Sequence, residues 1–394
     1  MNTHFSAFER TLHLERYPAK HQHVSLQAWD SADEYIIEHI ENCDILASLD
    51  GVDCKSDTPI FILNDEFGAL TCWLQAYSPV FISDSWISHK SLTANMLING
   101  YEPENVVFAD ALLDLATFAK APPALVIIKI PRTLALLEYQ LINLSKVLSP
   151  DTKVIAAGKV KAVQNSVLRL FEKYIGKTTT SLAKKKARLI FSRFEKKPSN
   201  DSPYPTTVTD PLISFELHNH ANVFCREHLD IGARILLKNL PDATDQKVID
   251  LGCGNGVLGV SILSKNPSAH VTFVDESFMA VESARLNVIA HLGSDERASF
   301  VVSNCLEEVL KDAESSYDLV LCNPPFHQQN AITDHVAYQM FKDSKSVLKH
   351  GGELRIVGNR HLDYPQKLKK LFGGYQVIDS NKKFSILSTY KARS

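Results

Sequence analysis

A glycine-rich turn in the second half of the chain constrains the fold most strongly. The run from Lys247 to Leu251 is largely apolar, with two β-branched residues, and it stops at Gly252-Cys253-Gly254-Asn255-Gly256. Helix-compatible residues follow, so the segment predicts a buried parallel strand, a tight turn and the start of a helix. Glycines at alternate positions allow positive φ angles and leave no Cβ between the backbone and a ligand. Such a turn suits a cofactor that carries a nucleoside.

The turn by itself fits two classes of cofactor. Gly254-x-Gly256-x-x-Gly259 has the spacing of dinucleotide-binding folds, and Asp275 lies about where an acid would bind a ribose. The frame Asp250-x-Gly252-x-Gly254-x-Gly256 is instead typical of methyltransferases that use S-adenosylmethionine (SAM). A dehydrogenase and a methyltransferase are therefore both open at this point.

A second motif, Asn323-Pro324-Pro325-Phe326, favours the methyltransferase. It follows an apolar run from Tyr317 to Cys322 that predicts a strand, which the prolines end because they lack amide donors and fix φ. Asn323 is therefore expected at the carboxyl end of a strand, where open α/β sheets bind their ligands. The motif resembles the signature of methyltransferases that act on amino or amide nitrogens.

The residues of this motif suit the chemistry of an exocyclic amino group, whose lone pair is delocalised into the ring of the base. The side-chain oxygen of Asn323 and the backbone carbonyl of Pro324 can hold its two hydrogens. They would aim the developing lone pair at the sulfonium methyl group, through positioning and electrostatics. Phe326 offers a face on which the base can stack. Asn323, Pro324 and Phe326 are therefore the predicted catalytic residues.

The first half of the chain repeats the pattern of the second half. Residues 59–70 predict a strand, a turn and a helix start, with Gly68 opposite Gly256 and with Asn64 and Glu66 in place of two glycines. Further matches in the same order align Asp84 with Asp275, Asn99 with Asn287 and Lys129 with Asn323. The first copy lacks the glycines that admit a cofactor and carries a lysine at the acceptor position, so it is expected to have lost its chemistry.

The repeat and the composition predict three regions. Residues 1–197 form the degenerate methyltransferase-like domain, and the Pro-, Ser- and Asn-containing stretch at 198–212 reads as a linker. Residues 213–394 form the catalytic domain. The alternation of apolar and polar residues over 213–217 predicts a strand at its beginning.

Charge is distributed unevenly although the net charge is only −3. Residues 151–197 contain thirteen Lys or Arg against three acids and include Lys184-Lys185-Lys186, and residues 359–394 contain eight against two. Segregated positive charge of this kind is expected to bind the phosphates of RNA. A solvated helix face is the alternative explanation for either cluster.

Other features exclude several classes of protein. No apolar run approaches the length of a membrane-spanning helix, and the first ten residues are not signal-like. Seven cysteines without CxxC spacing indicate reduced thiols in the cytoplasm. His218 and His220 lack partners at ligand spacing, so no metal site is expected.

Several stretches give the chain a more specific resemblance. It is similar to the ribosomal RNA guanine-N2 methyltransferases that pair a degenerate methyltransferase domain with an active one. The matching stretches are 26–30, 63–70, 131–138, 218–224, 323–329 and 359–364. The first, third and last of them separate the members that act on 23S ribosomal RNA from other Asn-Pro-Pro methyltransferases.

This resemblance implies the fold and the function. The fold is α/β, with two tandem Rossmann-like class I methyltransferase domains of which the amino-terminal one is degenerate and binds RNA. The expected reaction is SAM-dependent methylation of the exocyclic N2 amino group of a guanine in 23S (large-subunit) ribosomal RNA. The expected enzyme is a cytoplasmic monomer that needs neither a metal nor a membrane.

The resemblance also assigns cofactor contacts in the second domain. Asp275 would bind the ribose hydroxyls, and Asn304 and Cys305 would bracket the adenine. Phe224 and the segment that contains Asp230 would close over the cofactor. The expected cofactor-binding residues are Phe224, Asp230, Asp250, Gly252, Gly254, Gly256, Asp275, Asn304 and Cys305.

Rival functions stay open on the sequence alone. A dehydrogenase would need a nicotinamide cofactor and a proton-relay residue, and an RNA-binding scaffold without catalysis would fit the first half. A methyltransferase for a protein glutamine shares the Asn-Pro-Pro logic, usually with tyrosine after the prolines. Methylation of a guanine in 16S ribosomal RNA is a further alternative.

Overall fold

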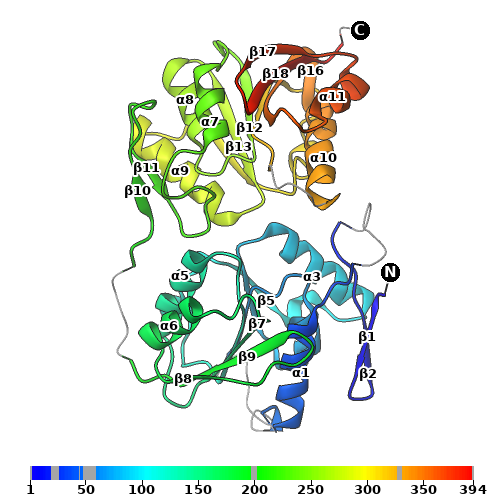
Figure 1. Ribbon diagram of the computed structural model, residues 1–394, viewed down its shortest axis with the longest axis vertical. Coiled ribbons are helices and arrows are strands. Elements are labelled where there is room, and N and C mark those ends of the chain that lie inside the picture. The colour runs from blue at the N-terminus through cyan, green and yellow to red at the C-terminus, as the bar shows by residue number, and fades with distance from the viewer. Residues whose placement is uncertain are drawn as a thin grey trace. The chain divides into compact units, whose positions relative to one another are not determined.

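The computed structural model describes residues 2–18, 26–43, 45–47, 59–196, 202–325 and 331–392. The chain divides into two compact units, Met1–Pro203 and Tyr204–Ser394, which we call unit 1 and unit 2 (Figure 1). Within the described residues, no helix has both the length and the apolar character that crossing a membrane requires.

Unit 2 is built on a seven-stranded sheet in the order β14-β13-β12-β15-β16-β18-β17. The first five of these strands are parallel, whereas β18 is antiparallel to both β16 and β17. The strands are β12 (Lys247–Leu251), β13 (His270–Asp275), β14 (Ala298–Val302), β15 (Tyr317–Cys322), β16 (Leu348–Asn359), β17 (Gln376–Ser380) and β18 (Phe384–Tyr390). The chain order reverses between β12 and β15, and ligands of open α/β sheets bind at the carboxyl ends of strands at such a switch point.

Helices cover both faces of this sheet, which explains why its central strands are apolar on both sides. Helices α7, α8 and α9 pack on one face and α10 and α11 on the other (Figure 1). They are α7 (Ile231–Lys238), α8 (Val257–Lys265), α9 (Phe278–Leu292), α10 (Ala331–Val347) and α11 (Tyr364–Phe372). Each βα connection thus delivers residues to the carboxyl edge of the sheet.

Unit 1 has the same architecture, with the strand order β5-β4-β3-β6-β7-β9-β8. Its strands are β3 (Ile60–Leu63), β4 (Val80–Ser83), β5 (Val107–Asp110), β6 (Leu125–Lys129), β7 (Lys153–Lys159), β8 (Thr178–Thr180) and β9 (Ala187–Ser192). Its helices are α1 (Ser31–Asn42), α2 (Ala69–Trp73), α3 (Trp86–Ile98), α4 (Leu115–Phe118), α5 (Leu134–Ser145) and α6 (Asn165–Tyr174). The shared strand order confirms the predicted repeat and the α/β fold of two tandem Rossmann-like domains.

The strand registers confirm one alignment of the repeat and correct another. Lys129 and Asn323 each lie one position beyond the residue paired with the end of β3 or β12, so they match as predicted. On β13 and β4, Asp275 and Ser83 likewise lie one position beyond the residue that pairs with the end of β12 or β3. Ser83, and not Asp84, is therefore the counterpart of Asp275 in unit 1.

The counterpart of Asn287 is Asn95 and not Asn99. Asn287 Nδ2 donates to the carbonyl oxygens of Asn255 and His218, at 2.9 and 3.1 Å. Asn95 Nδ2 likewise donates to two backbone carbonyl oxygens, at the corresponding places in unit 1. Asn95 and Asn99 lie one helical turn apart on one face of the helix, which is why the sequence pattern does not separate them.

Two short antiparallel pairs complete the units, β1 (His4–Ala7) with β2 (Arg10–His13) and β10 (Thr206–Val208) with β11 (Leu217–Asn219). Strand β10 lies within the stretch that the sequence predicts as a linker. The prediction of a strand over 213–217 is wrong except at its last residue. The side chain and the backbone carbonyl of Asp210 accept hydrogen bonds from the amides of Leu212 and Ile213, and the chain forms a turn there instead.

Candidate active site

The glycine turn between β12 and α8 adopts a conformation that requires glycine. Gly252, Gly254 and Gly256 have φ angles of 69°, 53° and 77°. A Cβ on Gly256 would lie 2.7 Å from the Cβ of Ala284, so this glycine is needed for packing against α9. A Cβ on Gly254 would meet no atom within 4 Å. The backbone at Gly254 therefore faces open space in which a ligand can approach it.

Backbone hydrogen bonds tie this turn to the neighbouring strand. The amides of Gly252 and Cys253 both donate to the carbonyl oxygen of Val274, at 2.8 and 3.0 Å. The amide of Gly256 donates to the carbonyl of Cys253 at 2.8 Å. The turn is thus held at the carboxyl end of β13, beside the switch point of the sheet.

Asp250 supports the turn from within the protein. Side chains alternate along β12, so Asp250 points to the α8 face, where its carboxylate accepts the amide of Gly259 at 2.9 Å. Burial raises the pKa of Asp250 to about 7 against the opposing effect of this hydrogen bond, and the charge of Asp275 adds to the rise. Asp250 therefore positions the start of α8, and its part in cofactor binding stays a prediction.

Asp275 lies at the end of β13 with its carboxylate directed at the same turn. Its two oxygens accept the amides of Gly254 at 2.9 Å and Ser277 at 3.1 Å. Burial raises the pKa of Asp275, and these hydrogen bonds partly offset the rise. An ionised carboxylate has about four acceptor positions, so Asp275 retains acceptor capacity for the hydroxyls of a ribose.

Asn304 and Cys305 follow β14 at the same edge of the sheet. The Sγ of Cys305 donates to Oδ1 of Asn304 at 3.8 Å, and Cys305 has a positive φ of 50°. The next amide, from Leu306, donates to Asp343 of α10 at 3.3 Å. Asp343 is a residue that the sequence motifs missed, because only the fold brings α10 beside this loop.

Asn323 follows β15 and is held by the residue that caps α7. Its Nδ2 donates to Oδ2 of Asp230 at 2.9 Å, whereas its Oδ1 is buried and has no hydrogen-bond partner among the described residues. Pro324 is buried, and Phe326 lies outside the described residues. Phe224 is 63% exposed, on the segment that leads into α7. The covering role predicted for Phe224 stays a prediction.

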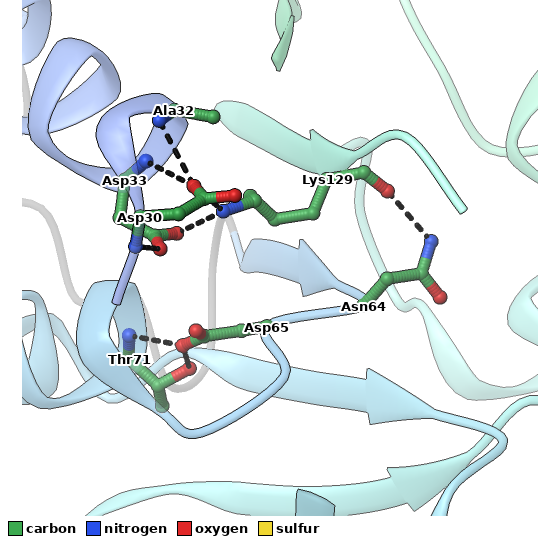
Figure 2. Close-up of polar contacts among 7 residues, drawn as sticks. All are labelled: Asp30, Ala32, Asp33, Asn64, Asp65, Thr71 and Lys129. Carbon is green, nitrogen blue, oxygen red and sulfur yellow. Dashed lines mark hydrogen bonds and ion pairs between the residues drawn. The ribbon is translucent and has the colours of Figure 1, made fainter. Parts of the chain in front are cut away.

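The corresponding position in unit 1 is filled by an ion pair (Figure 2). Lys129 Nζ donates to Oδ1 of Asp30 at 2.8 Å and to Oδ1 of Asp33 at 2.5 Å. Although burial lowers it, the pKa of Lys129 is raised by these two carboxylates. Asn64 has a φ of 62° in the place of Gly252, and its Nδ2 donates to the Lys129 carbonyl at 3.0 Å.

Asp65 in unit 1 makes the helix contact that Asp250 makes in unit 2, but from a different position in the chain. Its Oδ2 accepts the amide and the hydroxyl of Thr71, both at 2.8 Å (Figure 2), just as Asp250 accepts from the helix that follows its turn. One ammonium cannot neutralise the three carboxylates of this cluster. Burial raises the pKa of Asp33 to about 7, because the charge of Lys129 offsets the effect of burial only in part.

The lysine cluster that the sequence predicts to bind RNA is partly neutralised within unit 1. Lys184 forms an ion pair with Glu38 of α1, and Lys185 Nζ lies 2.6 Å from Oε2 of Glu34. Lys186 remains exposed. The acids lie about 150 residues before the lysines in sequence, since the two ion pairs span 146 and 151 residues. No group of three or more metal-ligating side chains occurs in the ranges that the structure describes.

The fold and the site together define a Rossmann-like methyltransferase preceded by a degenerate copy of itself. Residues 2–196 match the family described as RLMG N-terminal domain, and residues 214–388 match the methyltransferase small domain. The ribosomal RNA large subunit methyltransferase G of Pseudoalteromonas atlantica is 52% identical over 99% of this chain and 100% of its own length. The enzyme of the same name from Aeromonas salmonicida is 51% identical over 96% and 97%. This chain belongs to the family of ribosomal RNA large subunit methyltransferase G.

A solved structure of similar fold comes from T. thermophilus. It is a 16S rRNA N2 G1207 methyltransferase (RsmC) in complex with AdoMet and guanosine. The two chains are 19% identical, with a TM-score of 0.74 over 99% of this chain and 97% of that one. The likeness thus extends over both units, including the degenerate one.

Proposed function

We propose that this protein transfers a methyl group from SAM to the exocyclic N2 amino group of a guanine in large-subunit (23S) ribosomal RNA. The names of its relatives support the class of RNA, and the AdoMet and guanosine of the similar solved structure support the cofactor and the base. The observation that carries the proposal is the buried Oδ1 of Asn323, which lacks a partner among the described residues. Leaving such an acceptor unpaired costs about 1–3 kcal/mol, and the amino group of a base would pair with it.

The residues of unit 2 fit SAM at the carboxyl edge of the sheet. Gly254 would admit the cofactor to the backbone, Asp275 would accept from its ribose hydroxyls, and Asn304 and Cys305 would flank its adenine. When bound, SAM supplies an electrophilic methyl group on a sulfonium centre. On transfer of that methyl group, the electron pair of the C–S bond would stay on sulfur, so the cofactor would supply both the methyl group and its leaving group.

Asn323 would act on the other reactant. Its Oδ1 and the carbonyl of Pro324 would accept the two N2 hydrogens and turn the developing lone pair toward the methyl group. As the N–C bond forms, the nitrogen becomes strongly acidic and releases its proton to water. This sequence of events requires no dedicated general base.

A set of exposed basic residues lies at the same edge of the sheet and suits a polyanionic substrate. Arg360 follows β16, and Lys382 and Lys383 precede β18, which is antiparallel to β16. The amide of Arg360 donates to the Lys383 carbonyl at 2.9 Å, so the two segments adjoin. Because β16 neighbours β15, this set lies on the side of the sheet edge where Asn323 lies. We propose that it contacts RNA phosphates.

The proposed contact is tested by two matched pairs of adjacent lysines. Lys382→Glu with Lys383→Glu is expected to weaken RNA binding and to lower the slope of log affinity against log salt by about 1 per lysine. Lys369→Glu with Lys370→Glu changes the net charge equally, but these residues lie at the far end of α11, which runs away from the edge. Equal losses in both variants, measured by filter binding at several salt concentrations, would contradict the proposed contact.

A glycine substitution tests the cofactor site. Gly254→Ala is expected to reduce SAM affinity more than about tenfold, or 1.4 kcal/mol, since its methyl group would enter the open space beside the turn. Gly373→Ala is the matched control, because Gly373 also has a positive φ, of 91°, and a Cβ there meets no atom within 4 Å. Both variants place an alanine at a positive φ, which costs roughly 1–2 kcal/mol. Isothermal titration that finds equal SAM affinity in both would move the cofactor away from this turn.

The proposed reaction is tested with ribosomal RNA from a strain that lacks the corresponding modification. The protein is incubated with labelled SAM and either 23S RNA, 16S RNA or a release factor, and the label is then mapped. Label on the N2 atom of one 23S guanine is the expected result. Label in 16S RNA or on a glutamine would establish one of the alternative acceptors instead.

We further propose that the enzyme acts as a monomer in the cytoplasm and that unit 1 contributes to RNA binding. The cytoplasm is where bacterial ribosomal RNA is made. In unit 1 the contact would come from exposed basic residues such as Lys159, Lys161 and Lys186, because Lys184 and Lys185 are engaged with α1. Sedimentation with and without RNA, followed by the same salt titration on glutamate variants of these three, tests both parts.

A further inference from the structure

Among the described residues, one side chain holds the amide of Asn323, that of Asp230. Asp230 caps α7, and its Oδ2 accepts both the Nδ2 of Asn323 at 2.9 Å and the amide of Ala233 at 3.0 Å. Its Oδ1 accepts a hydrogen bond from the Sγ of Cys225 at 3.9 Å. Asp230 is therefore fixed by the helix that it caps and can in turn fix Asn323.

An ionised carboxylate can only accept hydrogen bonds, whereas a side-chain amide has a donor end and an acceptor end. Asp230 therefore selects the orientation in which Nδ2 of Asn323 faces it. The buried Oδ1 is then left facing away, with no partner in the part of the chain that the structure describes. In the flipped orientation the donor end would face the hydrogens of the acceptor amino group, which would repel it.

We propose that Asp230 is a positioning residue for methyl transfer, which presents Oδ1 of Asn323 to the amino group of the base. This assignment rests on the proposed function, since it needs an amino group as acceptor. It differs from the cofactor contact that the family resemblance implies for Asp230. The two roles separate experimentally, because a positioning residue changes turnover and a cofactor contact changes SAM affinity.

Unit 1 supports the assignment independently. Asp30 caps α1, the counterpart of α7, and its Oδ1 accepts the amides of Ala32 and Asp33 as well as Nζ of Lys129 (Figure 2). Lys129 matches Asn323 in the register of the sheet. The capping aspartate thus holds a nitrogen from the end of the same strand in both units, although that nitrogen belongs to different residue types. The cap position is built to hold the side chain at this strand end.

Capping of α7 is the merely structural role that Asp230 could have. Asn and Ser cap helices about as well as Asp, so Asp230→Asn and Asp230→Ser should both retain the fold. Neither variant can select the orientation of the Asn323 amide. The introduced asparagine can face Asn323 with either end of its amide, and the serine hydroxyl is too short to reach it while it caps the helix. A thermal melt checks that both variants are folded.

Asp230→Asn and Asp230→Ser are expected to lower kcat by tenfold to about a hundredfold, the cost of a misplaced reacting group. The Kd for SAM should change less than threefold. In a double-mutant cycle, adding Asp230→Asn to Asn323→Ala should lower kcat no further, since Asp230 acts through Asn323.

Each outcome bears on a different claim. Wild-type kcat in folded Asp230→Asn and Asp230→Ser, alongside an impaired Asn323→Ala, would overturn the positioning role and leave the proposed function standing. A weakened SAM affinity, or a double variant slower than Asn323→Ala, would overturn it in favour of a cofactor contact. Normal turnover in Asn323→Ala would instead overturn the proposed function itself.

Discussion

Asn323→Ala is expected to lower the rate of methyl transfer about a hundredfold or more while SAM affinity stays nearly unchanged. The side chain would contact the acceptor nitrogen, and the loss of one positioned polar contact of this kind costs about 2.7 kcal/mol or more of transition-state stabilisation. Single-turnover rates with labelled SAM and isothermal titration of SAM measure the two quantities separately. Folding should be preserved, because the residue lies after the end of β15 and its Oδ1 has no described partner to lose.

Asn304→Ala is the matched control for this prediction. Asn304 is also an asparagine after a strand of the same sheet, but it follows β14, where the adenine is expected. Its loss should raise the Kd for SAM and leave turnover at saturating SAM close to normal. If Asn323→Ala weakens SAM binding as much as Asn304→Ala does, then Asn323 belongs to the cofactor site and not to the acceptor site.

The central strands and the turns between them could be predicted from the sequence, because local residue types dictate them. The apolar run of β12 and the glycines with positive φ occur within a few residues of each other and leave few alternatives. The match of Lys129 to Asn323 was predictable for the same reason, since each residue directly follows an apolar strand. Features of this kind depend on short-range constraints.

Contacts between distant segments could not be predicted. The sequence shows Lys184 and Lys185 as part of a basic cluster, and only the fold brings the acids of α1 beside them. Similarly, nothing near Asn323 indicates that Asp230, 93 residues earlier, holds its amide. The replacement of Asp250 by Asp65 could not be predicted either. The carboxylate lies on the strand in unit 2 and in the turn in unit 1, although in both units it accepts an amide of the helix that follows the turn.

Lys129→Met is expected to lower the free energy of unfolding of unit 1 by about 3–5 kcal/mol, the usual cost of removing one partner from a buried ion pair. Methionine fills a similar volume, so the effect would come from charge and not from a cavity. Asp30, Asp33 and Asp65 would then lack their ammonium partner. Chemical denaturation followed by hydrogen exchange on β3 and β6 assigns the loss to unit 1.

Two controls show whether charge is the cause. Lys184→Ala removes a lysine that also pairs with an acid of α1, but its side chain is 46% exposed, so its loss should cost less than about 1 kcal/mol. Adding Asp33→Ala to Lys129→Met should recover part of the loss, because Ala233 occupies the equivalent helix position beside Asp230 in unit 2.

The pH dependence gives the cluster a further signature. A protonated carboxyl group needs no cationic partner, so the destabilisation by Lys129→Met should be largest at pH 8. It should shrink as the pH falls from 8 toward 7, because the pKa of Asp33 is about 7 in the intact cluster and rises further when Lys129 is removed, so the variant takes up this proton at a higher pH than the intact protein does. A pH-independent loss would mean that Lys129 stabilises unit 1 through packing alone. The ion pair would then be incidental to the way in which unit 1 closes the position that Asn323 occupies in unit 2.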